Sequence, residues 1–197
     1  MEIVSLIIAI LALFLSIMSF GYSIRKDKRN FVLNQLIEIK NNILIGCDAL
    51  EKSNLYGFLS NQLKKITTEN KQEILDDFLL YRPEISKSCS NIIMYSSMVK
   101  ATPNSVALMQ CCSKILIMFD NINQIIANQS EINEIIQKST DLISAGIKDK
   151  TLININNLKL KVVLEINNLI NDIIKSKIKS GDLLSTLTNA KVPEEEI

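Results

Sequence analysis

The residue types that carry most enzymatic chemistry are sparse in this sequence of 197 residues, which contains no histidine. General acid–base work would fall to Asp, Glu, Lys or Tyr, and nucleophilic attack to Ser or Cys. Asp76 and Asp77 are an adjacent acidic pair, but on a helix their carboxylates would point in different directions. The isolated glycines form no phosphate-binding loop, and no hydrolase, zinc-peptidase or kinase motif is present. We therefore predict no enzymatic activity, no catalytic residue and no cofactor.

The four cysteines, Cys47, Cys89, Cys111 and Cys112, lack the paired spacing of zinc sites. Cys111 and Cys112 lie in an apolar helical stretch, where a free cysteine behaves as a small core residue. We predict buried structural thiols and no metal site, with a redox role or acylation as the alternatives.

Arg82 is the one arginine outside the basic cluster that follows the N-terminal apolar segment, and it precedes Pro83, where a helix break is expected. A guanidinium recognises phosphate or carboxylate through two parallel hydrogen bonds, and Lys87 follows about one turn later. This pair predicts a site for a small anionic ligand or a protein partner in the cytosol. An ordinary surface ion pair is the alternative.

A stripe of small residues repeats at intervals of four and three along the N-terminal segment, formed by Ser5, Ala9, Ala12, Ser16, Ser19 and Ser23. In lipid, small residues on one face let helix backbones approach closely, and the 4-3 spacing is that of a left-handed helix pair or bundle. The stripe predicts homo-oligomers formed through this helix. The alternative is that Ser and Ala are simply tolerated in membrane helices.

The same segment is apolar enough to anchor the protein in a bilayer. Residues 3–24 carry no charge, and at about 1.5 Å per residue they reach roughly 33 Å. Only two residues precede this run, so the basic start of a cleaved signal peptide is missing. Basic residues follow it instead, namely Arg25, Lys26, Lys28 and Arg29. They predict an outside N-terminus, a cytosolic C-terminal part and contact with the headgroups of the inner membrane.

The charge balance of the remaining chain argues against nucleic-acid binding. Residues 30–197 hold 18 basic and 19 acidic groups, a net charge of −1, without the basic excess that phosphate binding requires. Frequent Ile, Asn and Lys, all with A/T-rich codons, indicate a low-GC bacterium or its mobile elements as the source.

The chain as a whole predicts an all-α protein, because glycine and proline are few and no strand-like alternation occurs. The small-residue spacing continues through Leu33, Ile37 and Leu44, with Leu36, Ile43 and Leu50 beside it, so one helix over residues 3–51 is expected. The further helices expected are 55–66, 70–81, a helix from 84, 103–127 after the Thr102–Pro103 start signal, 130–146 between a Ser130 cap and Gly146, 150–179 ended by Gly181, and 182–189. The apolar run 106–119 is too short for a second span.

Three parts follow from this layout: a transmembrane anchor (1–24), a juxtamembrane helical extension (25–53) and a cytosolic helical bundle (54–197). The arrangement resembles that of bacterial membrane-tethered defence effectors, in which a cytosolic domain binds an infection signal such as a cyclic nucleotide and membrane integrity then fails. The resemblance implies a bundle that senses a ligand or partner and transmits its state to the membrane helices. The alternative is a passive tether or scaffold for a cytosolic partner.

Overall fold

The computed structural model describes the backbone of residues 2–175, 177–178 and 182–187, and the side chains of these residues except 2–10 and 184. This part of the chain is all α-helical. Its elements are α1 (Glu2–Lys52), α2 (Leu55–Lys65), α3 (Lys71–Ser97), α4 (Pro103–Asn128), α5 (Ile132–Lys148), α6 (Thr151–Ile174) and the short 3-10 helix η1 (Leu184–Thr186).

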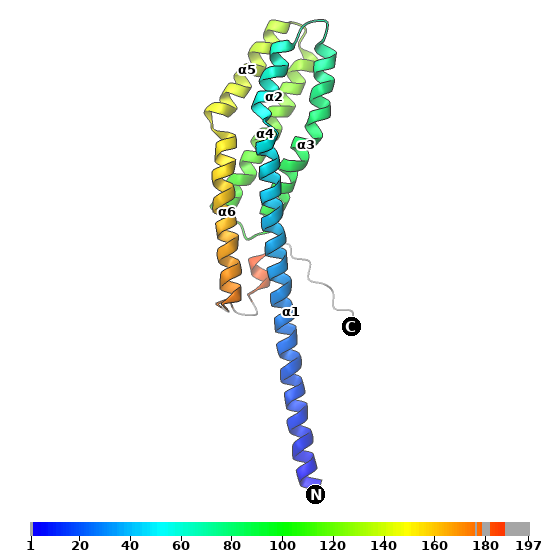
Figure 1. Ribbon diagram of the computed structural model, residues 1–197, viewed down its shortest axis with the longest axis vertical. Helices are drawn as coiled ribbons and strands as arrows, with labels where there is room; N and C mark the ends of the chain where they lie inside the picture. Colours follow the sequence, from blue (N-terminus) through cyan, green and yellow to red (C-terminus); the bar gives the residue numbers. More distant parts are fainter. Residues whose placement is uncertain (1, 176, 179–181, 188–197) are drawn as a thin grey trace.

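The helices form an elongated bundle with four antiparallel arms (Figure 1). Two arms are single helices, α3 and α4, and the other two are pairs of successive helices, α1 with α2 and α5 with α6. α1 packs against α3 and α6, and α4 packs against α3, α5 and α6. The bundle thus has a lower half built from α1 and α6 and an upper half built from α2 and α5, with α3 and α4 running through both.

The first helix is unbroken from Glu2 to Lys52, which confirms the expected single rod. Its bundle-facing side chains repeat every three or four residues and are almost completely buried: Val32, Leu36, Ile39, Ile43 and Leu50. The residues expected beside the continued small-residue spacing, such as Leu36 and Ile43, therefore form the core. Ile37, which was expected on that spacing itself, is 41% exposed. Gly46 allows α1 to approach α3 closely, because an added Cβ would lie 2.7 Å from Ile92 Cγ1.

The helix break expected at Pro83 is wrong, because α3 continues through this residue. Proline removes one backbone donor but leaves the rest of the ladder in place. The side chains on both sides of it, Phe78 and Ile85, are buried and hold the helix against its neighbours. Tertiary packing here outweighs the local preference against proline.

Two helix boundaries also differ from expectation. Ser130 does not cap α5, whose N-cap position is Glu131, and Gly146 lies inside this helix rather than at its end. Gly146 is retained in the helix because it faces Tyr56 and Met118, where a Cβ would lie 2.9 Å from the tyrosine oxygen. The helix expected to reach 179 ends at Ile174, and η1 occupies part of the segment expected at 182–189; Gly181 lies outside the described residues.

α4 begins as expected at Thr102–Pro103. The Thr102 hydroxyl accepts a hydrogen bond from the Ser105 amide at 3.1 Å, and Ser105 Oγ accepts one from the Thr102 amide at 2.9 Å. By length and composition, α4 is the candidate membrane span within the described residues. Its apolar side chains, such as Leu108, Ile115 and Ile122, are buried in the bundle, as in the core helix of a multi-helix domain.

The segment after α6 closes the lower end of the bundle. Leu183 and Leu187 are buried in the common core, and Leu187 pairs with Val99 in the α3–α4 loop. The Lys100 amide donates to the Thr186 carbonyl at 3.2 Å, which fixes this return segment to the same loop.

Candidate functional site

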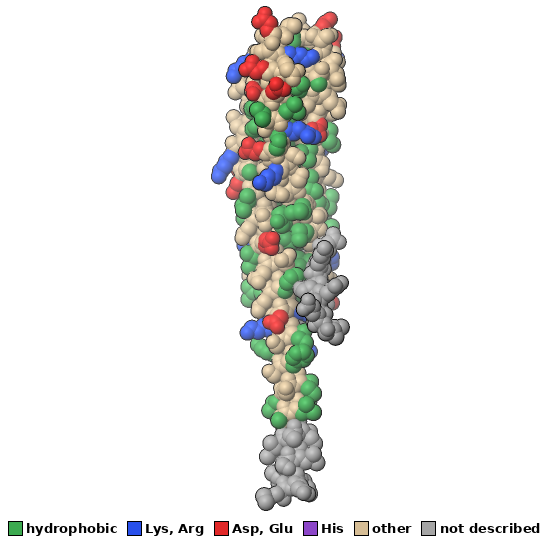
Figure 2. Space-filling model, turned by 90° about the vertical axis from the view of Figure 1, so that its right-hand side faces the viewer, with side chains coloured by type: hydrophobic (Ala, Val, Ile, Leu, Met, Phe, Trp, Pro, Cys, Tyr) green, Lys and Arg blue, Asp and Glu red, His purple; other side chains and the backbone are tan. Residues whose placement is uncertain are grey.

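The part of α1 below the bundle, residues 2–28, is called the stalk. From Leu11 onward its large apolar side chains are exposed: Leu11, Leu13, Phe14, Leu15, Ile17, Met18 and Phe20 are 56–68% accessible. Figure 2 shows hydrophobic side chains on the stalk below the lowest charged groups. Singly exposed apolar residues are normal on soluble proteins, whereas here they follow one another along several turns of one helix.

The described stripe residues Ala12, Ser16, Ser19 and Ser23 share one side of the stalk and are exposed. At about 100° per residue this side lies roughly 150° from the direction of the core side chains of α1. Ser23 Oγ donates to Asp27 Oδ2 at 3.5 Å. The side chains of Ser5 and Ala9 lie outside the described residues.

The basic cluster lies where the stalk meets the bundle. Arg25, Lys26 and Lys28 are exposed, whereas Arg29 is half-buried. Arg29 Nη2 donates to the Ile174 carbonyl at 2.6 Å. A cation at the C-terminal end of α6 both satisfies a free carbonyl and complements the helix dipole.

Arg82 forms an ion pair on the surface between α3 and α4. Its Nε lies 2.9 Å from Asp120 Oδ1, and both side chains are about half exposed. Hydrogen bonding to Asp120 raises the pKa of the Arg82 guanidinium. Lys87 is exposed on the same unbroken helix, but five residues turn it by about 140° from Arg82. The structure therefore does not bring the two cations together.

Two of the four arms are interrupted at one level of the bundle, which we call the junction, and a third arm carries a proline there. α1 gives way to α2 at Asn54 and α5 to α6 at Lys150, the two described non-glycine residues with positive φ, 46° and 51°. Pro83 of α3 lies at this level too, since Tyr81 Oη donates to the Ser53 carbonyl. Only α4 crosses the junction without a break or a proline.

A cavity of about 270 Å³ opens at the junction between α4 and the ends of α2, α5 and α6, and we call it the junction cavity. Its wall combines the apolar side chains of Ile117, Met118 and Leu142 with the polar ones of Tyr56, Lys114, Asn121, Asp149 and Thr151. Lys114 Nζ lies 3.7 Å from Asp149 Oδ2, and both side chains are more than 60% exposed.

The hydroxyl of Tyr56 is buried against Gly146 and lies beside Thr151, without a hydrogen bond of good geometry. Burial raises the pKa of this phenol, and the contact with Thr151 lowers it by less. The sequence offers no signal for this residue, because its position beside Gly146 depends on two helix ends that lie far apart in the chain.

Three cysteines from three helices lie near one another in the core of the lower half: Cys47, Cys89 and Cys112. Burial raises the pKa of the Cys47 thiol to about 12. Hydrogen bonding to Cys89, together with burial, raises the pKa of Cys112. Since the thiolate is the reactive and metal-binding form, Cys47 and Cys112 are poor nucleophiles at neutral pH. The described residues contain no group of three or more ligands arranged to hold a metal ion.

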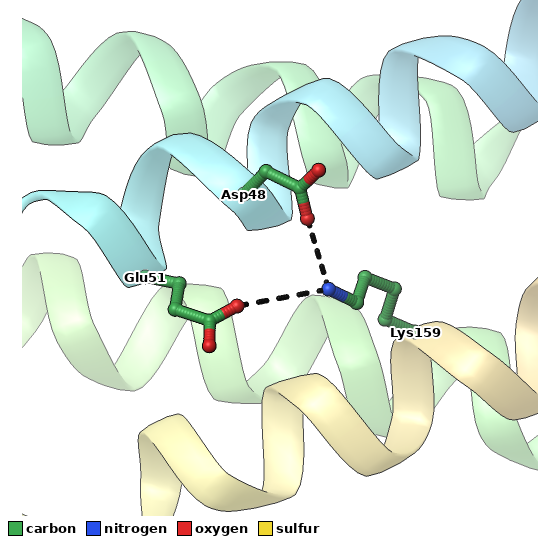
Figure 3. A network of polar contacts seen from close by, with 3 residues as sticks. All are labelled: Asp48, Glu51 and Lys159. Carbon is green, nitrogen blue, oxygen red and sulfur yellow. Dashed lines mark hydrogen bonds and ion pairs between the residues drawn. The ribbon is translucent and has the colours of Figure 1, made fainter.

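Lys159 of α6 joins this helix to the C-terminal end of α1 (Figure 3). Lys159 Nζ lies 2.9 Å from Asp48 Oδ1 and 3.8 Å from Glu51 Oε2, and the lysine side chain is only 13% exposed. Hydrogen bonding to Asp48 raises the pKa of Lys159. Lys40 Nζ donates to Asn167 Oδ1 at 3.4 Å further down the same interface. Polar contacts thus hold α1 to α6 over several turns.

Comparison of the chain with protein-family models, curated proteins and solved structures finds no match.

Proposed function

We propose that this protein is a single-pass membrane protein whose cytosolic bundle senses a ligand or partner and transmits its state to self-associating transmembrane helices. The observation that carries the proposal is the continuity of α1. One helix supplies both an uncharged N-terminal segment and the lower part of one arm of the bundle. A rearrangement of the lower half that moves α1 would therefore change the direction or rotation of the stalk.

The membrane anchor in this proposal is residues 1–24, followed by the extension 25–53 and the bundle 54–197. Support comes from the uncharged run of 22 residues and from the exposed apolar side chains of the stalk. The basic residues after it favour an outside N-terminus and a cytosolic bundle at the inner membrane. Because Arg29 also binds the end of α6, the bundle would begin at the headgroups.

Self-association would use the side of α1 that faces away from the core. The small-residue stripe points to this side, and so do the exposed residues Asn34, Asn41 and Ile45 of the extension. A second copy could pack along the stripe without meeting the bundle of the first. Close packing must supply most of the affinity, because hydrogen bonds between membrane helices average only about 0.6 kcal/mol.

A topology reporter and cysteine cross-linking test the anchor and the stripe. A fusion after Ile197 should be active only with a cytosolic reporter; activity only in the periplasm would overturn the orientation. In a chain with its native cysteines replaced by serine or alanine, A12C, S16C, S19C and S23C should cross-link in membranes. F14C and M18C, on other sides of the stalk, are the matched controls. Equal cross-linking at all positions would mean that the stripe meets no partner.

The trigger in this proposal is a small anionic ligand, including a nucleotide second messenger, or a protein partner. Arg82 supports it, since an anion would compete with the half-exposed Asp120 for the guanidinium. Membrane perturbation in the manner of defence effectors would then depolarise cells, and A12L, which separates the helices, should abolish it. If wild-type expression never changes a potential-sensitive dye while cross-linking persists, the protein is a passive tether.

A further inference from the structure

The junction cavity has the features of a small-molecule site that the proposed function leaves unassigned. Its volume of about 270 Å³ corresponds to roughly nine water molecules. This is slightly below the roughly 300–1,000 Å³ of typical ligand sites, and it has room for a molecule of amino-acid size. Apolar side chains line it beside a few polar groups, which is the usual make-up of a ligand pocket.

The polar groups of the cavity match a ligand that carries one positive and one negative charge. Lys114 and Asp149 lie 3.7 Å apart, farther than the 2.7–2.9 Å of a close charged hydrogen bond, and both are exposed at the cavity wall. Each therefore keeps hydrogen-bonding capacity for an added carboxylate or ammonium group. A molecule with these two groups on one carbon would present each charge to its opposite.

The buried hydroxyl of Tyr56 lies against Gly146 and beside Thr151, so it belongs to the packed wall of the cavity and not to its polar groups. Met118 and Leu142 would meet an apolar side chain of the ligand.

We propose that the junction cavity binds a free α-amino acid with an apolar side chain of leucine size. Lys114 would hold the carboxylate and Asp149 the ammonium group. The site is formed by α4 together with the ends of both interrupted arms, so an occupant would contact the upper and lower halves at once. This site is separate from the Arg82–Asp120 pair, and its regulatory meaning rests on the sensing role in the proposed function.

The test uses the full-length protein in nanodiscs, with L-leucine as the probe and calorimetric titration as the measurement. Saturable binding is expected for L-leucine, with at least tenfold weaker binding for 4-methylpentanoate, which lacks the ammonium group, and for 3-methylbutylamine, which lacks the carboxylate. The variants Lys114→Gln and Asp149→Asn should each lower affinity at least tenfold. Lys161→Gln, an exposed lysine on the neighbouring α4–α6 groove, is the matched control and should bind as wild type.

Absence of saturable L-leucine binding up to 10 mM would overturn the whole site, as would equal binding of the two single-charge analogues. These outcomes differ from failure of the proposed function, because the stripe cross-linking and the topology reporter do not depend on this ligand.

Discussion

At the scale of single residues, burial decides the chemistry of the cysteines. Cys47, Cys89 and Cys112 are buried on three helices of one core, whereas Cys111, the direct neighbour of Cys112, is partly exposed in the groove between α4 and α6. The sequence predicted structural thiols correctly for the buried three. It could not show that they meet, because their proximity depends on how α1, α3 and α4 pack.

We expect this difference in burial to appear as a difference in reaction rate. In the folded protein at pH 8, iodoacetamide should label Cys111 at least tenfold faster than Cys47, whose pKa is raised to about 12. Mass spectrometry of timed samples measures the labelling at each cysteine. In a denaturant the four cysteines should react at similar rates; equal rates in the folded state would contradict the prediction.

The Lys159 contacts predict a stability difference between two neighbouring carboxylates. Asp48→Asn should lower the free energy of unfolding by about 1 kcal/mol, because it weakens a 2.9 Å charged hydrogen bond to a largely buried lysine. Glu51→Gln, at 3.8 Å, is the matched control and should have a smaller effect. Urea unfolding curves provide both values, and a larger loss for Glu51→Gln would contradict this assignment.

The pH dependence of the same contact has a definite sign. The pKa of Lys159 is raised in the folded protein above its ordinary value near 10.4. Its contribution to stability is therefore complete below about pH 10 and is lost as the pH rises through the folded-state pKa. The difference between wild type and Asp48→Asn should shrink over that range and stay constant between pH 6 and 9.

At the scale of elements, the two internal prolines have opposite relations to their helices. Pro103 occupies the first turn of α4, where its missing donor would be unpaired in any case. Pro83 lies inside α3, where it removes a hydrogen bond to the turn before it. Both prolines were expected to mark helix boundaries, but only Pro103 lies at one.

This contrast predicts opposite results for the same substitution. Pro83→Ala should stabilise the protein by about 1–3 kcal/mol, because alanine restores the donor and suits a helix interior. Pro103→Ala should be neutral or slightly destabilising, since proline is well suited to the start of a helix. Thermal unfolding of the two variants compares them directly, and destabilisation by Pro83→Ala would indicate that the proline is required at the junction.

Periodicity alone was sufficient to predict most of the helices but not the phase of α1. Thr102–Pro103 carried a complete start signal, and the capping geometry of α4 follows from these residues. Along α1, apolar residues occur on more than one side, so the stripe and the core face could not be separated by spacing. The junction cavity was also beyond prediction, because it is made by helix ends whose αL residues, Asn54 and Lys150, carry no glycine signal.

At the scale of the whole molecule, one hydrophobic core runs through both halves of the bundle. Phe58 stacks on Tyr81 with ring centroids 4.0 Å apart, and Phe78 lies 5.6 Å from Phe119, which ties α2, α3 and α4 together next to the junction. The upper half is therefore attached to the lower half by packing as well as by the continuous helix α4.

We expect a single cooperative unfolding transition for the bundle. Phe78→Ala, at a fully buried position, should lower the free energy of unfolding by about 3–5 kcal/mol while keeping one transition. Leu80→Ala, on the exposed side of the same helix, is the control and should change it by less than about 1 kcal/mol. Two separate transitions, by calorimetry and circular dichroism, would mean that the halves unfold independently.

The unbroken first helix also makes the molecule a mechanical lever. With the bundle gripping residues 29–52, the stalk extends about 40 Å beyond the grip. A tilt of about ten degrees at Arg29 would displace its far end sideways by roughly 7 Å, close to the separation of two packed helices. In the proposed membrane arrangement, small adjustments between α1 and α6, such as a change at Lys159 or at the Arg29 contact, would thus be magnified along the stalk and change which helices it meets.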